Sequence, residues 1–65
     1  MSRYLVEKMD GDMCKSSRAI LAQSPLRAAV TVTSREILHR TNNAESRWIR
    51  VTNDDNDKFE FAYGD

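Results

Sequence analysis

The sequence predicts an α+β domain in which one helix packs on one face of a four-stranded, mainly antiparallel sheet, with the element order ββαββ. Three observations predict it: a strand pair with a turn signal near the N-terminus, a second pair near the C-terminus, and a helix start between them. The 65 residues are enough for one domain with a thin core, so we expect a single domain over residues 1–65.

The N-terminal strand pair is predicted from residues 3–9 and 18–22. Tyr4, Leu5 and Val6 have strong sheet preference, and the Asp-Gly pair that follows at 10–11 is a strong turn signal. We expect the loop to extend as far as residue 15. The pattern does not decide which face of the first strand is buried, because Tyr4 and Val6 lie on one face and Leu5 and Met9 lie on the other.

A helix is predicted from about Ser24 to about Leu38. Ser24 can cap the first turn, and Pro25 has the backbone angle that the first helical position needs. One helical face then collects Leu26, Ala29, Val30, Thr33 and Ile37. Residues 28–33 also alternate as a strand would, and their β-branched side chains lower helix propensity. We prefer the helix, because the serine can cap the first turn, the proline fits the first helical position, and Ala-Ala follows them.

The C-terminal strand pair is predicted from residues 47–52 and 58–63, which both alternate and flank a turn at 53–57. A polar break at 41–45 separates this hairpin from the helix. The apolar positions of all elements together define the expected core. Its members are Val6, Ile20, Leu26, Ala29, Val30, Ile37, Ile49, Val51, Phe59, Phe61 and Tyr63.

The segment from Arg18 to Ala29 contains a strand and then Ala-x-Ser-Pro-x-x-Ala-Ala, which opens the helix. In this layout the chain resembles small uncharacterised bacterial α+β domains of unknown function. The resemblance implies a fold and carries no active site.

Charge is balanced over the whole chain but not along it. The formal net charge is zero, whereas residues 15–50 hold seven basic and two acidic side chains and residues 51–65 hold one basic and five acidic. We prefer the interpretation that the acidic end neutralises the basic middle, although a basic middle could also meet an acidic partner. With no apolar run longer than four residues, no signal-peptide pattern and the single cysteine Cys14, we expect a cytoplasmic protein without a membrane partner.

No set of residues in the sequence supports catalysis. Cys14 and His39 form the one possible nucleophile–base pair, and no third group can be named to orient them. Asp10 and Asp12 flank Gly11 in a way that suits a solvated turn rather than acid–base chemistry. We therefore predict that the protein is not an enzyme and has no catalytic residues.

The acidic segment near the C-terminus resembles a calcium loop only in part. Asn53, Asp55 and Asp57 have the alternate spacing of calcium ligands, but Lys58 stands where glycine is required and Gly64 where glutamate is required. Side chains of this type more often bond their own backbone in turns. We expect no metal and no cofactor.

Trp48 and Arg50 are predicted to share the sheet face opposite the helix, and Arg47 and Arg18 complete the candidate interaction surface. Arg18 joins that face only if Ile20 does not point inward. Tryptophan and arginine favour protein contacts, so the leading hypothesis is a small interaction module that binds a protein or forms a homodimer through its sheet face or a sheet edge. The alternative is nucleic-acid binding through Trp48 and the basic middle segment. A third interpretation is that the indole binds no partner and only packs over the side chain of Arg50 or Leu5 at the surface.

Overall fold

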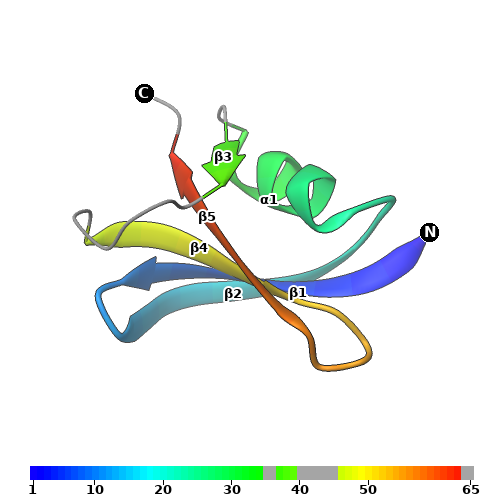
Figure 1. Cartoon of the computed structure of the whole chain (residues 1–65), viewed down its shortest axis with the longest axis horizontal. Coiled ribbons are helices and arrows are strands. Elements are labelled where there is room, and N and C mark those ends of the chain that lie inside the picture. The colour runs from blue at the N-terminus through cyan, green and yellow to red at the C-terminus, as the bar shows by residue number, and fades with distance from the viewer. Residues whose placement is uncertain (35–36, 40–45, 64–65) are drawn as a thin grey trace.

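The computed structural model describes residues 1–34, 37–39 and 46–63 (Figure 1). The elements are β1 (Ser2–Asp10), β2 (Met13–Ala22), α1 (Pro25–Thr33), β3 (Ile37–His39), β4 (Arg47–Thr52) and β5 (Lys58–Tyr63). The polar break expected at 41–45 lies outside the described residues. Gly64, which stands where a calcium loop requires glutamate, also lies outside the described residues.

The predicted four-stranded ββαββ arrangement is wrong, although the broad α+β class is confirmed. The described residues form one five-stranded antiparallel sheet with the order β2-β1-β4-β5-β3 and one short helix. The helix ends at Thr33 instead of continuing to about Leu38, and Ile37–His39 form the additional strand beside β5. The N-terminal turn is also tighter than expected, because β2 already begins at Met13.

Local interactions explain both ends of α1. The Ser24 side chain caps the first turn by accepting a hydrogen bond of 3.2 Å from the Arg27 amide, and Pro25 begins the helix. In the β-branched segment the Thr31 and Thr33 hydroxyls donate to backbone carbonyls four residues earlier at 2.8 and 2.9 Å, so both hydroxyls have partners within the helix. Ser34 then adopts a left-handed φ of 56°, which ends the helix.

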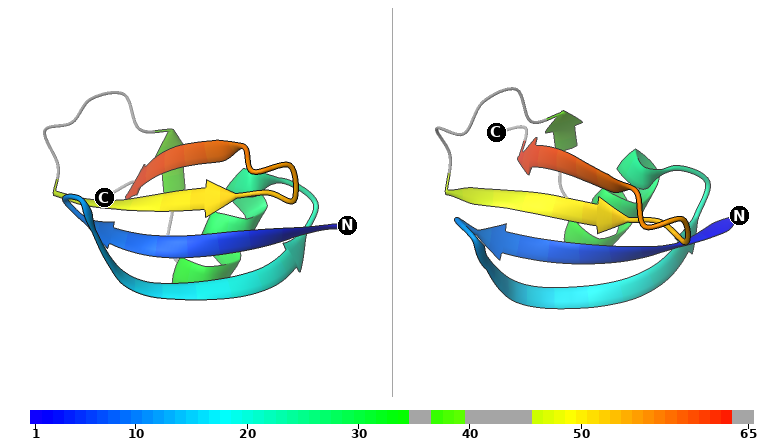
Figure 2. Two further views of the ribbon diagram at one scale, coloured as in Figure 1. Left: turned by 90° about the horizontal axis from the view of Figure 1, so that it is seen from below. Right: turned by 60° about the horizontal axis from the view of Figure 1, so that its bottom comes forward.

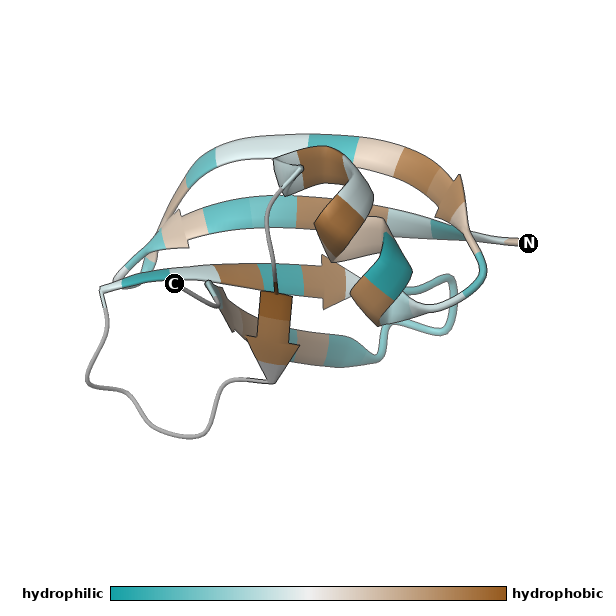
Figure 3. Cartoon of the chain, turned by 90° about the horizontal axis from the view of Figure 1, so that it is seen from above, coloured by the Kyte–Doolittle hydropathy of each residue, from teal (hydrophilic) through white to brown (hydrophobic). Residues whose placement is uncertain are grey.

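The helix covers one face of the sheet. It connects β2 to β3, which lie at opposite edges, so the chain crosses that face on its way. Figure 2 shows the sheet from its open side, and Figure 3 shows α1 and the hydrophobic β3 in front of it. No helix in the described part of the chain is long and apolar enough to cross a membrane.

The main core lies between α1 and the sheet. Six predicted members are buried there: Val6, Ala29, Ile37, Ile49, Val51 and Phe61. Four others are partly buried against them: Ile20, Leu26, Val30 and Tyr63. The structure adds Tyr4, which settles the inward face of β1, together with Ala22 and Ala28.

Phe59 is the one predicted core residue that the structure places outside the core. It is 36% exposed, whereas Phe61, two residues later on the same strand, is 1% exposed. The reason is its position, because Phe59 follows the β4–β5 turn at the end of the hairpin that lies away from α1 (Figure 1).

Candidate interaction surfaces

The four predicted surface residues lie on two different faces of the sheet. Arg18 is paired with the core residue Val6, and Ile20 packs against the core, so Arg18 is on the helix side. Arg47 is two residues before Ile49 and is also on that side. Trp48 and Arg50 share the open side. The structure therefore brings Trp48 and Arg50 together and separates them from Arg18 and Arg47.

Trp48 is buried although it points to the open side of the sheet. Its exposed fraction is 7%, and its indole Nε1 donates a hydrogen bond of 2.8 Å to the carbonyl oxygen of Gly11. Its partner across the ladder, Met9, is 4% exposed. Gly11 itself has a left-handed φ of 61° and donates its amide to the Ser46 carbonyl oxygen at 2.6 Å. The indole thus anchors the β1–β2 turn to β4.

Arg50 forms a two-pronged ion pair with Glu7 on the neighbouring strand. The Arg50 Nε lies 2.9 Å from Glu7 Oε1, and the Arg50 Nη2 lies 3.1 Å from Oε2. The Glu7 side chain is 14% exposed and that of Arg50 is 30% exposed. The hydrogen bond from Arg50 lowers the pKa of Glu7 below its usual value, against a smaller opposing effect of desolvation. The guanidinium is therefore largely occupied within the chain.

The Glu7–Arg50 pair predicts acid-sensitive stability. Because the folded-state pKa of Glu7 is lowered, its contribution is present above the ordinary value of 4.5 and is lost as the pH falls through the folded-state pKa. At pH 7 we expect Glu7→Gln to lower the free energy of unfolding by about 1 kcal/mol, a value that allows for solvent screening of this partly exposed pair. At pH 2.5 the difference between variant and native chain should shrink towards zero. Urea denaturation at both pH values measures it, and an unchanged difference would contradict the assigned role of this pair.

Cys14 and His39 are carried by strands at opposite edges of the sheet. Cys14 is exposed, and its Sγ donates to the Ser16 carbonyl oxygen at 3.4 Å. Local desolvation, followed by the hydrogen bond to Glu7, raises the pKa of the thiol. A raised pKa keeps the sulfur protonated, whereas a nucleophilic cysteine needs the thiolate.

The acidic segment at 53–57 is organised by its own backbone. The Asn53 Oδ1 accepts hydrogen bonds of 2.9 Å from the amides of both Asp55 and Asp57. This is the asparagine-turn geometry in which the side chain closes the loop. In the part of the chain that the structure describes, no three His, Cys, Asp or Glu side chains are grouped to hold a metal ion.

β2 forms an exposed edge of the sheet. Among the described strands its partner is β1 alone, and nearly all of its side chains are exposed, with Met13 and Leu21 each 63% exposed. The pairing with β1 is irregular around Lys15, because Lys8 pairs with Ser16 and Met9 with Cys14. A sheet edge is among the interaction surfaces that the sequence predicts, but the sequence does not indicate that β2 forms it. The missed signal is that residues 13–19 have no clean apolar alternation, which fits a strand of which only the C-terminal end, at Ile20 and Ala22, packs against the core.

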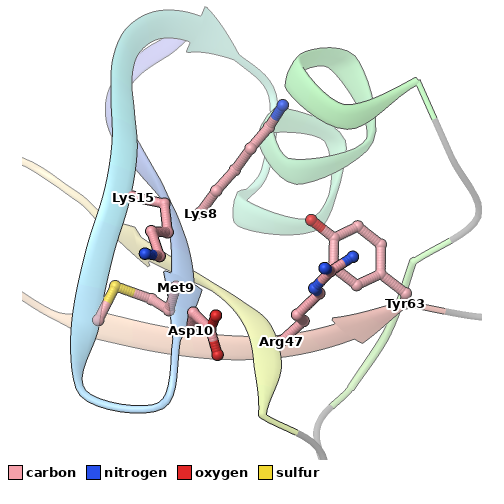
Figure 4. A pocket seen from close by; sticks show the side chains of 6 residues that line it. All are labelled: Lys8, Met9, Asp10, Lys15, Arg47 and Tyr63. Atoms are coloured by element: carbon pink, nitrogen blue, oxygen red, sulfur yellow. The ribbon is translucent and has the colours of Figure 1, made fainter.

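A basic hollow of about 220 Å³ lies on the helix side of the sheet (Figure 4). It is lined by Lys8, Met9, Asp10, Lys15, Arg47 and Tyr63. Only Arg47 was among the predicted surface residues. The other five residues come from the three strands β1, β2 and β5, and no local pattern in the sequence indicates that they meet.

Comparisons with protein families, curated proteins and solved structures found no match to this chain.

Proposed function

We propose that this chain is a non-enzymatic interaction module that forms a homodimer by pairing β2 of one copy with β2 of a second copy. The observation that carries the proposal is the β2 edge, which is ten residues long and in the described structure is hydrogen-bonded on one side. An exposed edge of this kind presents unpaired backbone groups to which another strand can be added. Two-fold symmetric dimers are the commonest homo-oligomers, and two identical strand edges can pair about such an axis.

The residues of β2 fit an antiparallel partner. Met13 and Leu21 lie near opposite ends of the strand, so antiparallel pairing brings the Met13 end of one copy to the Leu21 end of the other. If Ser17 lies on the two-fold axis, Ser16 is opposite Arg18 of the second copy. This register keeps the two arginines from facing each other, which matters because like charges directly opposite are destabilising.

The open face around Trp48 is a weaker candidate for the same function. The indole is buried and the Arg50 guanidinium is bound to Glu7, so neither is presented to a partner. The nucleic-acid alternative needs an exposed aromatic ring for stacking, and Trp48 does not provide one. We also propose a cytoplasmic location, because Cys14 is an exposed free thiol and such thiols persist in reducing compartments.

The β2 pairing predicts that the native chain sediments as a monomer–dimer equilibrium between about 1 µM and about 1 mM. It also predicts a site-specific cross-link. In a Cys14→Ser background, Ser17→Cys places one thiol of each copy at the two-fold axis, about 5 Å apart between Cα atoms, which suits a disulfide. Mild oxidation should therefore give a covalent dimer.

Asp54→Cys in the same background is the matched control, because Asp54 is exposed in the β4–β5 turn and strand β1 lies between that hairpin and β2. We expect Asp54→Cys to cross-link slowly and Ser17→Cys rapidly. A monomer at every concentration, or equal rates of cross-linking for the two variants, would overturn the proposed pairing.

A further inference from the structure

Side chains from four strands line the basic hollow. Lys8 and Asp10 come from β1, Lys15 from β2, Arg47 from β4 and Tyr63 from β5 (Figure 4). Asp10 and Arg47 are partners across the β1–β4 ladder, which fixes the base of the hollow. The site is therefore built on strands, and its geometry does not depend on a long loop.

The charges of the basic hollow favour an anion. Lys8, Lys15 and Arg47 supply three positive charges, and Asp10 supplies one negative charge. Within the described residues, no ion pair or side-chain hydrogen bond joins any of these four side chains to a partner. The three cations outnumber the one carboxylate of the hollow, so they repel one another on balance, and a bound anion relieves that repulsion.

The shape and donors of the hollow point to a phosphate group. The guanidinium of Arg47 offers two parallel donors that match two phosphate oxygens, and Lys8 and Lys15 add two point charges to the lining. The volume of about 220 Å³ is below the usual range of pockets for drug-sized ligands, so a small molecule is favoured over a large one. We infer that the basic hollow binds the phosphate group of a small phosphate monoester, a function separate from the proposed dimer.

Substitution of Asp10 and substitution of Arg47 should change the affinity of the basic hollow for phosphate in opposite directions. If the hollow holds a dianion, removing the Asp10 charge should strengthen binding, and removing the Arg47 charge should weaken it. For Asp10→Asn we expect the dissociation constant to fall by about threefold, in line with the strength of exposed charge pairs. For Arg47→Gln we expect it to rise by about tenfold, as for the loss of a hydrogen bond to a charged group.

The experiment is an amide NMR titration of the full chain with glycerol phosphate and, separately, with inorganic phosphate. Sodium chloride at equal ionic strength is the reference, and the protein concentration is held constant throughout both titrations. Arg27→Gln is the matched control, because it removes one positive charge from the exposed side of α1 and should leave binding unchanged. Saturable shifts at residues 8–10 and 47, with the expected order of variants, support the site.

Two results would overturn the proposed phosphate site. One is that phosphate and chloride give the same shifts, which would show a general salt effect. The other is that Arg47→Gln and Arg27→Gln weaken binding equally, which would show attraction to the overall charge and not to the hollow. Both variants should keep the native spectrum elsewhere, so a failure of this site is distinguishable from a failure of the β2 pairing.

Discussion

Trp48→Ala is expected to remove a large part of the protein's stability at 25 °C. Truncating a buried tryptophan costs about 3–5 kcal/mol, and a chain of this length has a total stability of about 3–10 kcal/mol. The indole is 7% exposed and holds the Gly11 carbonyl oxygen at the β1–β2 turn, so its removal leaves a cavity and an unpaired acceptor together. Far-UV circular dichroism and urea denaturation measure the effect, since the variant lacks the only tryptophan as a fluorophore.

Trp48→Phe separates the two contributions. Phenylalanine keeps most of the apolar volume and lacks the Nε1–H group, so we expect a folded protein that is less stable by about 1–3 kcal/mol. If Trp48→Ala were as stable as Trp48→Phe, the indole would not be packed as described, and the open sheet face would again be available to a partner.

The second large effect is expected at Phe61. Phe61→Ala should cost about 3–5 kcal/mol, because this side chain is 1% exposed at the centre of the main core. Phe59→Ala is the matched control on the same strand, where the side chain is 36% exposed and the expected cost is about 1 kcal/mol. Urea midpoints followed by Trp48 fluorescence compare the two variants. Equal losses would contradict the assigned position of α1 over β5.

The elements with strong local signals were predictable from the sequence. The Ser-Pro start of α1 and the alternating C-terminal hairpin form as expected, because a cap and a period-two pattern act within a few residues. Ile37 shows the limit of such reasoning. Its burial is confirmed, but it reaches the core from strand β3 and not from the helix. Helical spacing and a strand after a turn can place the same side chain inward, and the sequence does not distinguish them.

The candidate surfaces were less predictable, because they depend on pairing between distant segments. Alternation identifies the face of the sheet on which Trp48 lies, but its burial depends on Gly11, 37 residues away in the chain. The ion pair that occupies Arg50 likewise needs the β1–β4 register, which places Glu7 opposite. The basic hollow combines Lys8 with Tyr63 in the same way. The sheet order determines all three features, and no local pattern encodes it.

Amide hydrogen exchange along β2 tests the proposed dimer most directly. In an edge strand, alternate amides point away from the neighbouring strand and are protected only if a second strand is added. The proposal predicts that the outward amides between Ser16 and Leu21 exchange slowly at about 1 mM protein and lose their protection on dilution to about 1 µM. Rapid exchange of these amides at both concentrations would contradict it.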